Sequence, residues 1–546
     1  MRLKSILLTA VCLLAGISLS ARNITSDTRT TTTENTASTT TLTRTQKTTS
    51  ATPDATVRIH DAGTGETIPA EIYGQFSEHL GRCIYGGLWV GEDSDIPNIN
   101  GYRKDVFEAL KALKVPVMRW PGGCFADDYH WMDGIGPQEK RAYISNNNWG
   151  GTLEDNSFGT HEFLNLCEML DIQPYISGNV GSGSVEEMAD WVEYMTSDAK
   201  STMADLRRAN GREHPWKVKY FGIGNEAWGC GGSMRPEYYS DLFRRYGTYL
   251  RNFGDNRLYK IASGASDYDY NWTEVLMNNL LNRGMDAISL HYYTVLDWNG
   301  KGRATVFSDE AYYNLISKSI EIEEVLRRHI AIMDSIDPQN SVALLLDEWG
   351  TWYDVEPGTN PGHLFQQNTM RDALIAALNF DIFHKYTRRL KMCNIAQVVN
   401  VLQSMILTDG PQMVLTPTYH VFEMYNVHQN AEYLSSDCVS PMVKCSRKVD
   451  VPRVDATASR KDGVMNISLV NTDLKRSATV LITFDNPKAV SQVLSARVLT
   501  SANAHDCNDF ASPGKVAPAE FKSFRLTAAG LEVTLPPLSI VALGVK

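Results

Sequence analysis

Between residues 71 and 408, short apolar runs alternate with longer stretches of helical periodicity. The runs are rich in β-branched and aromatic residues, as buried parallel strands are. Eight of them occur, at Ile72–Ser77, Val115–Trp120, Ile172–Ser177, Tyr220–Glu226, Leu258–Ser263, Ala287–His291, Val342–Glu348 and Ile395–Val401. Helices are expected between them, at Arg103–Leu113, Thr160–Leu170, Ser184–Thr196, Pro236–Phe253 and Ala311–Ile336. A strand followed by a helix, repeated eight times, predicts an α/β fold, a (β/α)8 TIM barrel at residues 71–408.

The pattern changes after residue 408. Apolar and polar residues alternate in short runs separated by Gly, Asn, Asp or Pro, at Val464–Asn471, Ala478–Phe484, Val493–Leu499 and Leu531–Leu535. This period of two is typical of antiparallel sheet, so we expect a C-terminal β-sandwich domain at residues 409–546. Residues 55–70 contain a similar run at Thr56–His60 and are expected to contribute one strand to that sandwich.

The first 54 residues show no pattern of a folded domain. Arg2 and Lys4 precede the apolar run Ile6–Ile17, and small residues follow it. This layout predicts a secretory signal peptide at residues 1–21, and with it a secreted protein that is periplasmic or extracellular. Residues 22–54 are mostly Thr, with Ser, Asn and Ala, which predicts a disordered linker. No later apolar run is long enough to cross a membrane.

Composition narrows the function further. The 546 residues carry a formal net charge of −11, which argues against nucleic acid or an anionic membrane as the partner, because both attract basic surfaces. A neutral polymer such as a polysaccharide is compatible with this charge. The cysteines show no CxxC pair and no zinc-type spacing, so we expect no metal and no cofactor. Cys438 and Cys445 are close in sequence and are candidates for a disulfide.

Polar side chains gather where the expected strands end. The carboxyl ends of barrel strands face the active site. Glu226 ends the fourth strand and Glu348 the seventh, each with a Trp within two residues, so the two carboxylates can face each other across the barrel mouth. A single strand-end Glu is more often a salt-bridge partner. Two such groups, with Asn225 beside one of them, favour a retaining glycoside hydrolase, which needs a nucleophile and an acid/base.

At this point four blocks resemble a known family. They are Tyr73–Arg82, Arg119–Phe125, Gly224–Glu226 and Asp347–Trp349, and in this order and spacing they are similar to glycoside hydrolase family 51, the α-L-arabinofuranosidases. The resemblance implies that Glu348 is the nucleophile and Glu226 the acid/base. It also implies release of terminal α-L-arabinofuranosyl residues from plant cell-wall polysaccharides or oligosaccharides, with arabinan and arabinoxylan left as alternatives, by a homo-oligomer that in this family is often a hexamer.

The resemblance implies sugar contacts as well. Glu78 and Gln397 would bind arabinose hydroxyls, and Asn225 would hold the 2-hydroxyl. Tyr293 would hydrogen-bond the nucleophile. However, the chain has His291-Tyr292-Tyr293-Thr294 where the family commonly has His-Gln-Tyr-Tyr, so the choice between the two tyrosines stays open.

Three further residues complete the expected substrate site. Cys124 stands where many family members have Asn, and it would line the sugar pocket. His291 is expected to orient its neighbours by hydrogen bonds rather than to bind a metal. Trp349 would stack on a sugar ring, because aromatic faces pack on sugars, with a position in the core as the alternative.

Two other functions remain as alternatives. One is a different retaining activity of the same clan of barrel enzymes, such as an endo-glucanase or xylanase. The other is a carbohydrate-binding protein without catalysis, which the presence of both carboxylates disfavours. Hydrolysis of an aryl α-L-arabinofuranoside, compared with an aryl β-D-xyloside and β-D-glucoside, separates the three.

Overall fold

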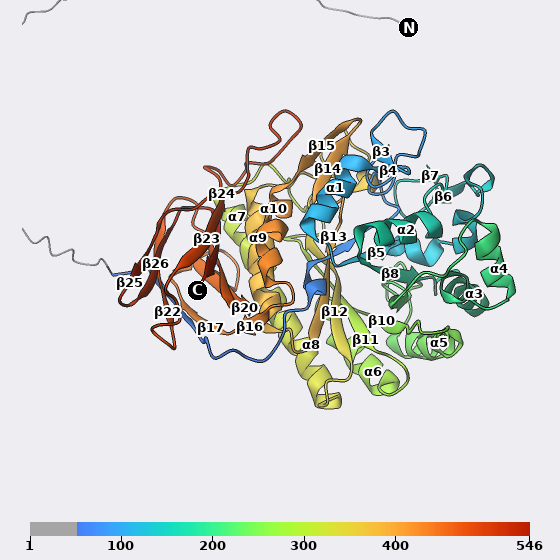
Figure 1. Ribbon diagram of the computed structural model, residues 1–546, viewed down its shortest axis with the longest axis horizontal. Helices are drawn as coiled ribbons and strands as arrows, with labels where there is room; N and C mark the ends of the chain where they lie inside the picture. The colour runs from blue at the N-terminus through green and yellow to red at the C-terminus, as the bar shows by residue number, and fades with distance from the viewer. Residues whose placement is uncertain (1–51) are drawn as a thin grey trace, which may run out of the picture. The chain divides into compact units, whose positions relative to one another are not determined.

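A computed structural model describes residues 52–546 of the chain (Figure 1). The predicted signal peptide and residues 22–51 of the predicted linker lie outside the described residues. The described residues form one compact unit. Among them, no helix combines the length and the apolarity that crossing a membrane requires.

The centre of the molecule is a closed barrel of eight parallel strands, which confirms the predicted fold class. In barrel order from the N-terminal strand, they are β2 (Gly74–Phe76), β5 (Val117–Trp120), β8 (Gln173–Gly178), β9 (Tyr220–Ile223), β10 (Tyr259–Ser266), β11 (Ala287–Thr294), β12 (Ala343–Thr351) and β13 (Leu390–Ala396). Neighbours in sequence are neighbours in the barrel, and β13 closes it against β2. The carboxyl ends of all eight strands therefore meet at one mouth.

Helices cover the outside of the barrel (Figure 1). They are α1 (Lys104–Leu113), α2 (Thr160–Leu170), α3 (Val185–Thr196), α4 (Thr202–Ala209), α5 (Pro236–Tyr249), α6 (Tyr270–Leu280), α7 (Asp309–Ile320), α8 (Ile322–Ile336), α9 (Met370–Lys385) and α10 (Pro417–Tyr425). The prediction of one helix over Ala311–Ile336 was wrong. The chain turns at Glu321 because α7 packs on α9 while α8 packs on α6.

The eighth strand is displaced from its prediction. It spans Leu390–Ala396, whereas the prediction began at Ile395. The apolar residues Val398 and Val401 are fully buried, but they belong to the loop that follows the strand. The apolar run therefore indicated buried residues and not a β-strand. Gln397 lies just beyond β13 rather than within it.

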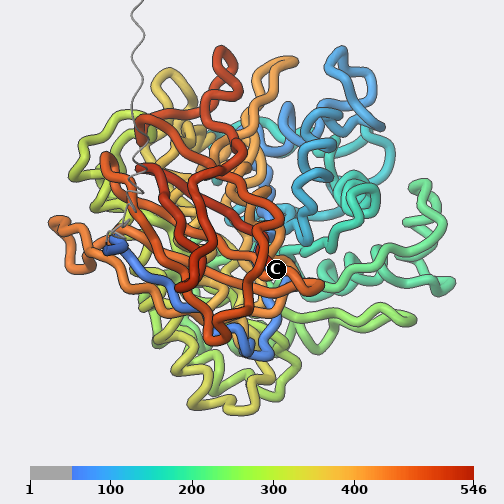
Figure 2. The backbone as a smooth tube through the Cα atoms, turned by 60° about the vertical axis from the view of Figure 1, so that its left-hand side comes forward, coloured from blue at the N-terminus to red at the C-terminus, as the bar shows by residue number. Residues whose placement is uncertain are grey.

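Two packed sheets make up the sandwich. One has the order β17-β1-β22-β26-β25, and the other β16-β20-β21-β27-β23-β24. The strands are β1 (Ala55–Ile59), β16 (Glu432–Leu434), β17 (Ser436–Val439), β20 (Val454–Lys461), β21 (Val464–Asn471), β22 (Ala478–Phe484), β23 (Val493–Thr500), β24 (Ala519–Glu520), β25 (Phe524–Thr527), β26 (Gly530–Leu535) and β27 (Ser539–Val545). Strand β1 pairs with β17 and with β22, so the N-terminal segment of the described chain lies beside C-terminal strands (Figure 2).

Helix α9 joins the two parts of the fold. Every residue of it except Lys385 is buried, because it packs against α7 and α10 on one side and β20, β21 and β27 on the other. A helix that is buried on all its faces is typical of such a central position. The domain boundary at residue 409 stays a prediction. Helix α10 lies beyond it in sequence and packs on the barrel helices α1 and α9.

Short hairpins extend the loops. They are β3 (Asn98–Ile99) with β4 (Tyr102–Arg103), β6 (Ile144–Asn146) with β7 (Thr152–Glu154), β14 (Ile406–Asp409) with β15 (Gln412–Leu415), and β18 (Met442–Val443) with β19 (Val451–Pro452). The β6–β7 hairpin matters most for the site, because its turn carries Trp149 to the barrel mouth.

Candidate active site

A buried arginine lies at the floor of the barrel mouth. Arg119, on β5, donates from Nη1 to Glu348 Oε1 at 2.8 Å and from Nη2 to Asn225 Oδ1 at 2.5 Å. Its guanidinium lies over the ring of Phe76, 4.6 Å from the centroid. A fully buried guanidinium needs such partners, because an unpaired buried charge is strongly destabilising. Arg119 therefore fixes the positions of side chains from β12 and from the loop after β9.

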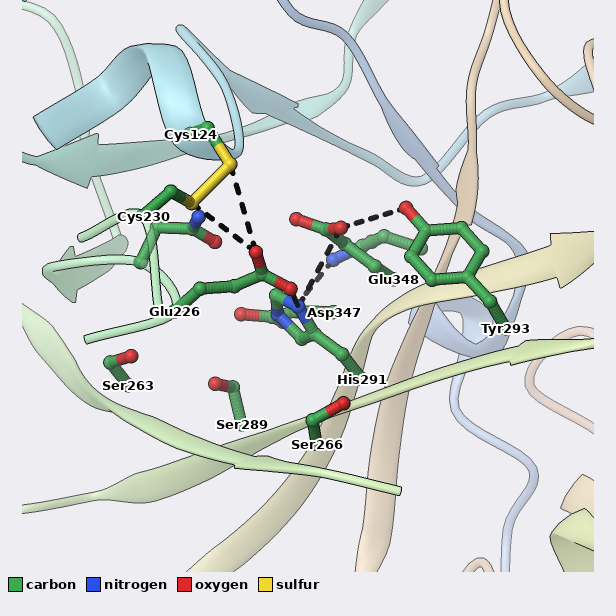
Figure 3. Close-up of polar contacts among 12 residues, drawn as sticks. Cys124, Glu226, Cys230, Ser263, Ser266, Ser289, His291, Tyr293, Asp347 and Glu348 are labelled. Atoms are coloured by element: carbon green, nitrogen blue, oxygen red, sulfur yellow. Dashed lines mark hydrogen bonds and ion pairs between the residues drawn. A yellow bond between two sulfur atoms is a disulfide. The ribbon is translucent and has the colours of Figure 1, made fainter. Parts of the chain in front are cut away.

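Glu348 is held as an anion. Besides Arg119, Tyr293 donates from its hydroxyl to Glu348 Oε2 at 2.7 Å, and His291 Nδ1 lies 3.6 Å from the same oxygen (Figure 3). Burial alone would raise the pKa of the Glu348 carboxyl. The charges of His291 and Arg119, with the hydrogen bonds from Arg119 and Tyr293, outweigh burial and lower that pKa below its usual value. A buried carboxylate that is kept ionised and held in one orientation by its donors is suited to act as a nucleophile.

Glu226 lies in the loop that follows β9. Its backbone has a φ of 40°, in the left-handed region that residues other than Gly rarely adopt, and such strain is often found at functional sites. Two N–H groups, of Gly229 and Gly231, donate to its carbonyl oxygen and hold this turn. The side chain is 17% exposed, compared with 6% for Glu348, so Glu226 is the carboxyl nearer to solvent.

The two carboxyl groups are close enough to act on one bond. An oxygen of Glu226, an oxygen of Glu348 and a ring nitrogen of His291 all lie within 4.8 Å of one another. His291 Nδ1 is 3.0 Å from Glu226 Oε1, so the imidazole lies between the two carboxyls (Figure 3). Burial would lower the pKa of His291, but the charges of Glu348 and Glu226 raise it.

A third carboxyl, Glu78, forms the wall across the mouth. It follows β2 and accepts three hydrogen bonds, from the Phe125 backbone at 3.1 Å, from Trp149 Nε1 at 2.8 Å and from Gln397 Nε2 at 2.9 Å. Burial, with the charge of Glu348, raises the pKa of Glu78 to about 7. A Cβ at Gly123 would lie 2.9 Å from Glu78 Oε1, so only glycine leaves space for this carboxyl.

Several buried polar atoms beside these carboxyls have no hydrogen-bond partner among the described residues. Besides Arg119 Nε, which faces Asp347 at 3.9 Å, they include the amide atoms Asn225 Nδ2 and Gln397 Oε1. Buried polar atoms are nearly always paired in folded proteins, so unpaired atoms at a mouth lined by carboxyls point to a polar ligand. Of these two amide atoms, one is a donor and the other an acceptor, which suits hydroxyl groups.

Cys124 does not offer a thiol to this site. It forms a disulfide with Cys230, with 5.5 Å between the Cα atoms, and so links the loop after β5 to the loop after β9 (Figure 3). The candidate disulfide between Cys438 and Cys445 is not formed. Both are free, and each Sγ faces a backbone carbonyl, of Val454 and Val449 respectively.

Trp349 and Tyr292 lie away from the site, which corrects the prediction that Trp349 stacks on a sugar. The Trp349 indole is fully buried among Phe380, Phe383 and Phe422, between β12 and the helices behind it. The Tyr292 hydroxyl donates to the Lys318 carbonyl at 2.6 Å. Successive side chains of a strand point to opposite faces. Glu348 and Tyr293 face the mouth, so the adjacent residues Trp349 and Tyr292 point away from it.

Aromatic side chains occur instead at the rim. Trp352 packs edge-on against Tyr293, with centroids 5.0 Å apart, and Trp298 packs against Trp352 at 5.4 Å. Trp298 is 53% exposed, which is unusual for so large an apolar side chain. Lys301 lies over both indole rings. These rings continue from Tyr293, the hydrogen-bond partner of Glu348, toward solvent.

Sequence reasoning gave no role to four residues that build this site: Arg119, Asp127, Trp149 and Cys230. A signal for Arg119 was present, since an arginine inside an apolar strand is rarely buried unless it is paired. Asp127 accepts from the Asn225, Val180 and Gly181 backbone and holds the Glu226 loop. Trp149 and Cys230 reach the site from distant loops, and nothing in the local sequence indicates that.

Comparison with known proteins agrees with this geometry. A family model described as "Alpha-L-arabinofuranosidase 1 domain" matches residues 109–309, and one described as "Alpha-L-arabinofuranosidase C-terminal domain" matches residues 347–539. An intracellular exo-α-L-arabinofuranosidase of Bacteroides ovatus is 62% identical over 496 residues, which cover 90% of this chain and 96% of that protein. A probable α-L-arabinofuranosidase C of Aspergillus niger is 32% identical over 473 residues, or 83% of this chain and 90% of that protein.

Solved structures show the same architecture. The family 51 arabinofuranosidase of Xanthomonas axonopodis pv. citri superposes with a TM-score of 0.87 at 48% identity, over 90% of this chain and 100% of that one. The α-L-arabinofuranosidase of Thermotoga maritima, in an arabinose complex, gives 0.76 at 28% identity, over 90% and 99%. A bifunctional glucanase-xylanase from a metagenome library gives 0.56 at 13% identity, over 91% and 100%, and shows a shared fold alone.

These comparisons overturn the predicted secretion. The Bacteroides ovatus relative matches 90% of this chain and is described as intracellular, so the predictions of a signal peptide and of a periplasmic or extracellular location were wrong. They depended only on the basic and apolar pattern of residues 1–21, which lie outside the described residues.

Replacing Trp349 by Ala tests its assignment to the core. Loss of a large buried aromatic side chain typically lowers the free energy of unfolding by about 3–5 kcal/mol. We therefore expect a lower Tm by calorimetry for Trp349→Ala, with Trp298→Ala as the matched control on an exposed indole. An unchanged Tm for Trp349→Ala would contradict the observed packing.

Proposed function

Because the chain belongs to glycoside hydrolase family 51, the α-L-arabinofuranosidases, we propose that Glu348 is its nucleophile and Glu226 its acid/base. The activity is hydrolytic release of terminal α-L-arabinofuranosyl residues with retention, by double displacement. The observation that supports the two roles best is the closeness of the two carboxyls within 4.8 Å. Retaining enzymes have carboxyls about 5–5.5 Å apart, whereas inverting enzymes need about 6.5–9.5 Å to admit a water.

In the first step, Glu348 attacks the anomeric carbon. Arg119 and Tyr293 each bind one of its oxygens, and this fixes the direction of the carboxylate. Glu226 gives a proton to the departing oxygen at the same time, so that the leaving group departs as an alcohol. The products of this step are the released alcohol and a glycosyl ester on Glu348.

In the second step, water cleaves that ester. Glu226, now ionised, takes a proton from the water as its oxygen attacks the anomeric carbon from the side that the leaving group vacated. Arabinose leaves with its original configuration, Glu348 is again a carboxylate and Glu226 again carries a proton. His291 lies between the two carboxyls and can stabilise whichever of them is charged.

The wall opposite the nucleophile is proposed to bind the arabinose hydroxyls. Glu78 would accept hydrogen bonds from them, while Asn225 Nδ2 and Gln397 Oε1 would gain the partners they lack. Asn225 is held by Arg119 and lies next to Glu226, which supports its contact with the 2-hydroxyl. Cys124 would line this pocket only through its disulfide.

The rim is proposed to bind the leaving part of the substrate. Trp298 and Trp352 offer aromatic faces toward solvent, and sugar rings pack on such faces. The substrates are therefore arabinofuranosyl-substituted plant cell-wall polysaccharides or their oligosaccharides, with arabinan and arabinoxylan as the two candidates. A homo-oligomer stays a prediction, which light scattering of the purified protein can test.

The two carboxyl roles predict different losses of activity. Glu348→Ala should lower kcat on every arabinofuranoside by at least roughly 10⁴-fold, because no covalent intermediate can form. Glu226→Ala should retain the first step on aryl substrates with good leaving groups, and added azide should restore turnover as arabinosyl azide. Glu324→Gln, on the exposed face of α8, is the control and should leave kcat unchanged. Equal losses for the two site variants on aryl substrates would oppose the assignment, and hydrolysis of aryl xyloside or glucoside at the arabinofuranoside rate would favour the rival activities.

We expect the pH dependence of kcat/KM to shift when one hydrogen bond to Glu348 is removed. The Tyr293 hydroxyl helps to lower the pKa of Glu348, so Tyr293→Phe should raise that pKa. Glu348 must be ionised to attack, and activity is lost as the pH falls through its pKa. The acid limb of the kcat/KM profile should therefore move to higher pH, while Tyr292→Phe should not move it. A shift in the opposite direction would contradict this role of Tyr293.

If the rim binds the leaving part of the substrate, removing the Trp298 indole should lower kcat/KM on substrates whose leaving part is a sugar chain. Aromatic stacking contributes about 0.5–1.5 kcal/mol, so Trp298→Ala should lower kcat/KM on an arabinose-substituted oligosaccharide by roughly 2–10-fold. Trp298→Phe should retain most of the activity, because it keeps an aromatic face. Steady-state kinetics on the oligosaccharide measures both. Identical kinetics for wild type and Trp298→Ala would exclude this subsite.

A further inference from the structure

Two sulfur atoms face the outer oxygen of Glu226. Oε2 lies 3.3 Å from Cys230 Sγ and 3.7 Å from Cys124 Sγ, while Oε1 faces His291 (Figure 3). A disulfide has no S–H and can donate no hydrogen bond. Among residues 52–546, no N–H or O–H group donates to Oε2 either. This oxygen therefore receives no hydrogen bond from an N–H or O–H group of the described residues.

The other ionisable groups near Glu226 come from three strands. His291 and Tyr293 are on β11, Glu348 is on β12, and Asp267 follows β10. None of them contacts Oε2. The polar contacts of this oxygen within residues 52–546 are thus with the two sulfur atoms.

We propose that the Cys124–Cys230 disulfide keeps hydrogen-bond donors away from Glu226 Oε2, and that a thiol reductant reversibly weakens proton donation by Glu226 because it creates two S–H donors beside this oxygen. This inference rests on the proposed role of Glu226. In the reduced protein, two S–H groups would lie within reach of Oε2. They would donate to the carboxylate form and thus stabilise the ionised state over the protonated one. The acid would then be less often protonated at neutral pH.

Reduction is a balanced two-electron reaction. A dithiol gives two electrons and two protons, the Cys124–Cys230 bond breaks, two S–H bonds form, and the dithiol becomes a disulfide. Cys230 is exposed and Cys124 partly so, which gives the reductant access. The free cysteines of the described chain nearest the barrel core, Cys83, Cys167 and Cys393, are buried.

The loop itself has a second anchor and should survive reduction. Asp127 lies in the same 3-10 helix as Cys124 (Cys124–Asp128), and its Oδ2 accepts from the Asn225 backbone at 2.8 Å. A Cβ at Gly231 would lie 1.8 Å from the Asn225 carbonyl oxygen, so the chain after Cys230 is tightly packed as well. We therefore expect the effect of reduction to be confined to Glu226 and its neighbours.

The test compares two leaving groups on the full chain. Wild type is assayed before and after dithiothreitol, with EDTA throughout so that new thiols bind no trace metal. Reduction should lower kcat/KM on an arabinose-substituted oligosaccharide by roughly tenfold, since this leaving oxygen needs a proton. It should change kcat/KM on 2,4-dinitrophenyl α-L-arabinofuranoside by less than about twofold, because that leaving group departs without one. The basic limb of the oligosaccharide pH profile should move to lower pH, and reoxidation should restore both values.

Two double variants separate the donors from the cross-link. Cys124→Ser with Cys230→Ser keeps two donors without a bond, and should resemble reduced wild type. Cys124→Ala with Cys230→Ala has neither donors nor bond, and should keep the wild-type basic limb. Neither should respond to dithiothreitol. Alkylation and mass spectrometry verify that reduction of wild type yields these two thiols.

Several outcomes would overturn the proposal. One is an equal loss on both substrates with an unmoved basic limb, which would indicate a purely structural bond. Another is a response to dithiothreitol in the Ala double variant, which would place the effect at another cysteine. Failure of the Glu226 assignment is seen separately, since Glu226→Ala in the oxidised enzyme would then show no dependence on the leaving group. If the double variants do not fold, reduction of wild type still decides.

Discussion

The active site depends on one buried cation. Arg119 reaches the barrel mouth from β5, and its guanidinium binds Glu348 on β12 and Asn225 in the loop after β9. Because the barrel interior is poor in solvent, each of these polar groups would be costly to bury alone. Together they compensate one another, and the cation also places Glu348 relative to the loop that carries Glu226. Without the arginine, Glu348 would be a buried anion with only Tyr293 and His291 to stabilise it.

The three carboxyls at the mouth differ in environment, and this is what separates their chemistry. Glu348 is surrounded by cations and a hydroxyl donor, which lower its pKa despite burial. Glu78 receives only neutral donors, and burial raises its pKa to about 7. Glu226 has a histidine on one oxygen and a disulfide on the other. One fold thus holds three carboxyls in three different electrostatic environments, as the proposed division of their roles requires.

The sequence predicts much of this arrangement, and the misses have physical causes. Periodicity found the barrel, and the strand-end rule brought Glu226 and Glu348 to one mouth. The alternation of side chains along a strand also held the answer for Trp349 and Tyr292, since the inward positions Glu348, His291 and Tyr293 require both of these to point outward. The end of the eighth strand could not be found, because Val398 and Val401 are as apolar as the strand before them. The pairing of Cys124 with Cys230 joins residues 106 positions apart, and local sequence carries no sign of it.

The unpaired amide atoms beside Glu78 explain how the proposed sugar-binding wall would select its ligand. Asn225 Nδ2 and Gln397 Oε1 are buried and have no hydrogen-bond partner in the described chain. A ligand with hydroxyls at both positions restores two buried hydrogen bonds. A ligand that lacks either hydroxyl leaves the protein atom buried and unpaired, which costs about 1–3 kcal/mol per group. In the proposed role of this wall, discrimination arises from the penalty for the wrong sugar more than from attraction to the right one, because Arg119 and Glu78 already hold these two side chains in position.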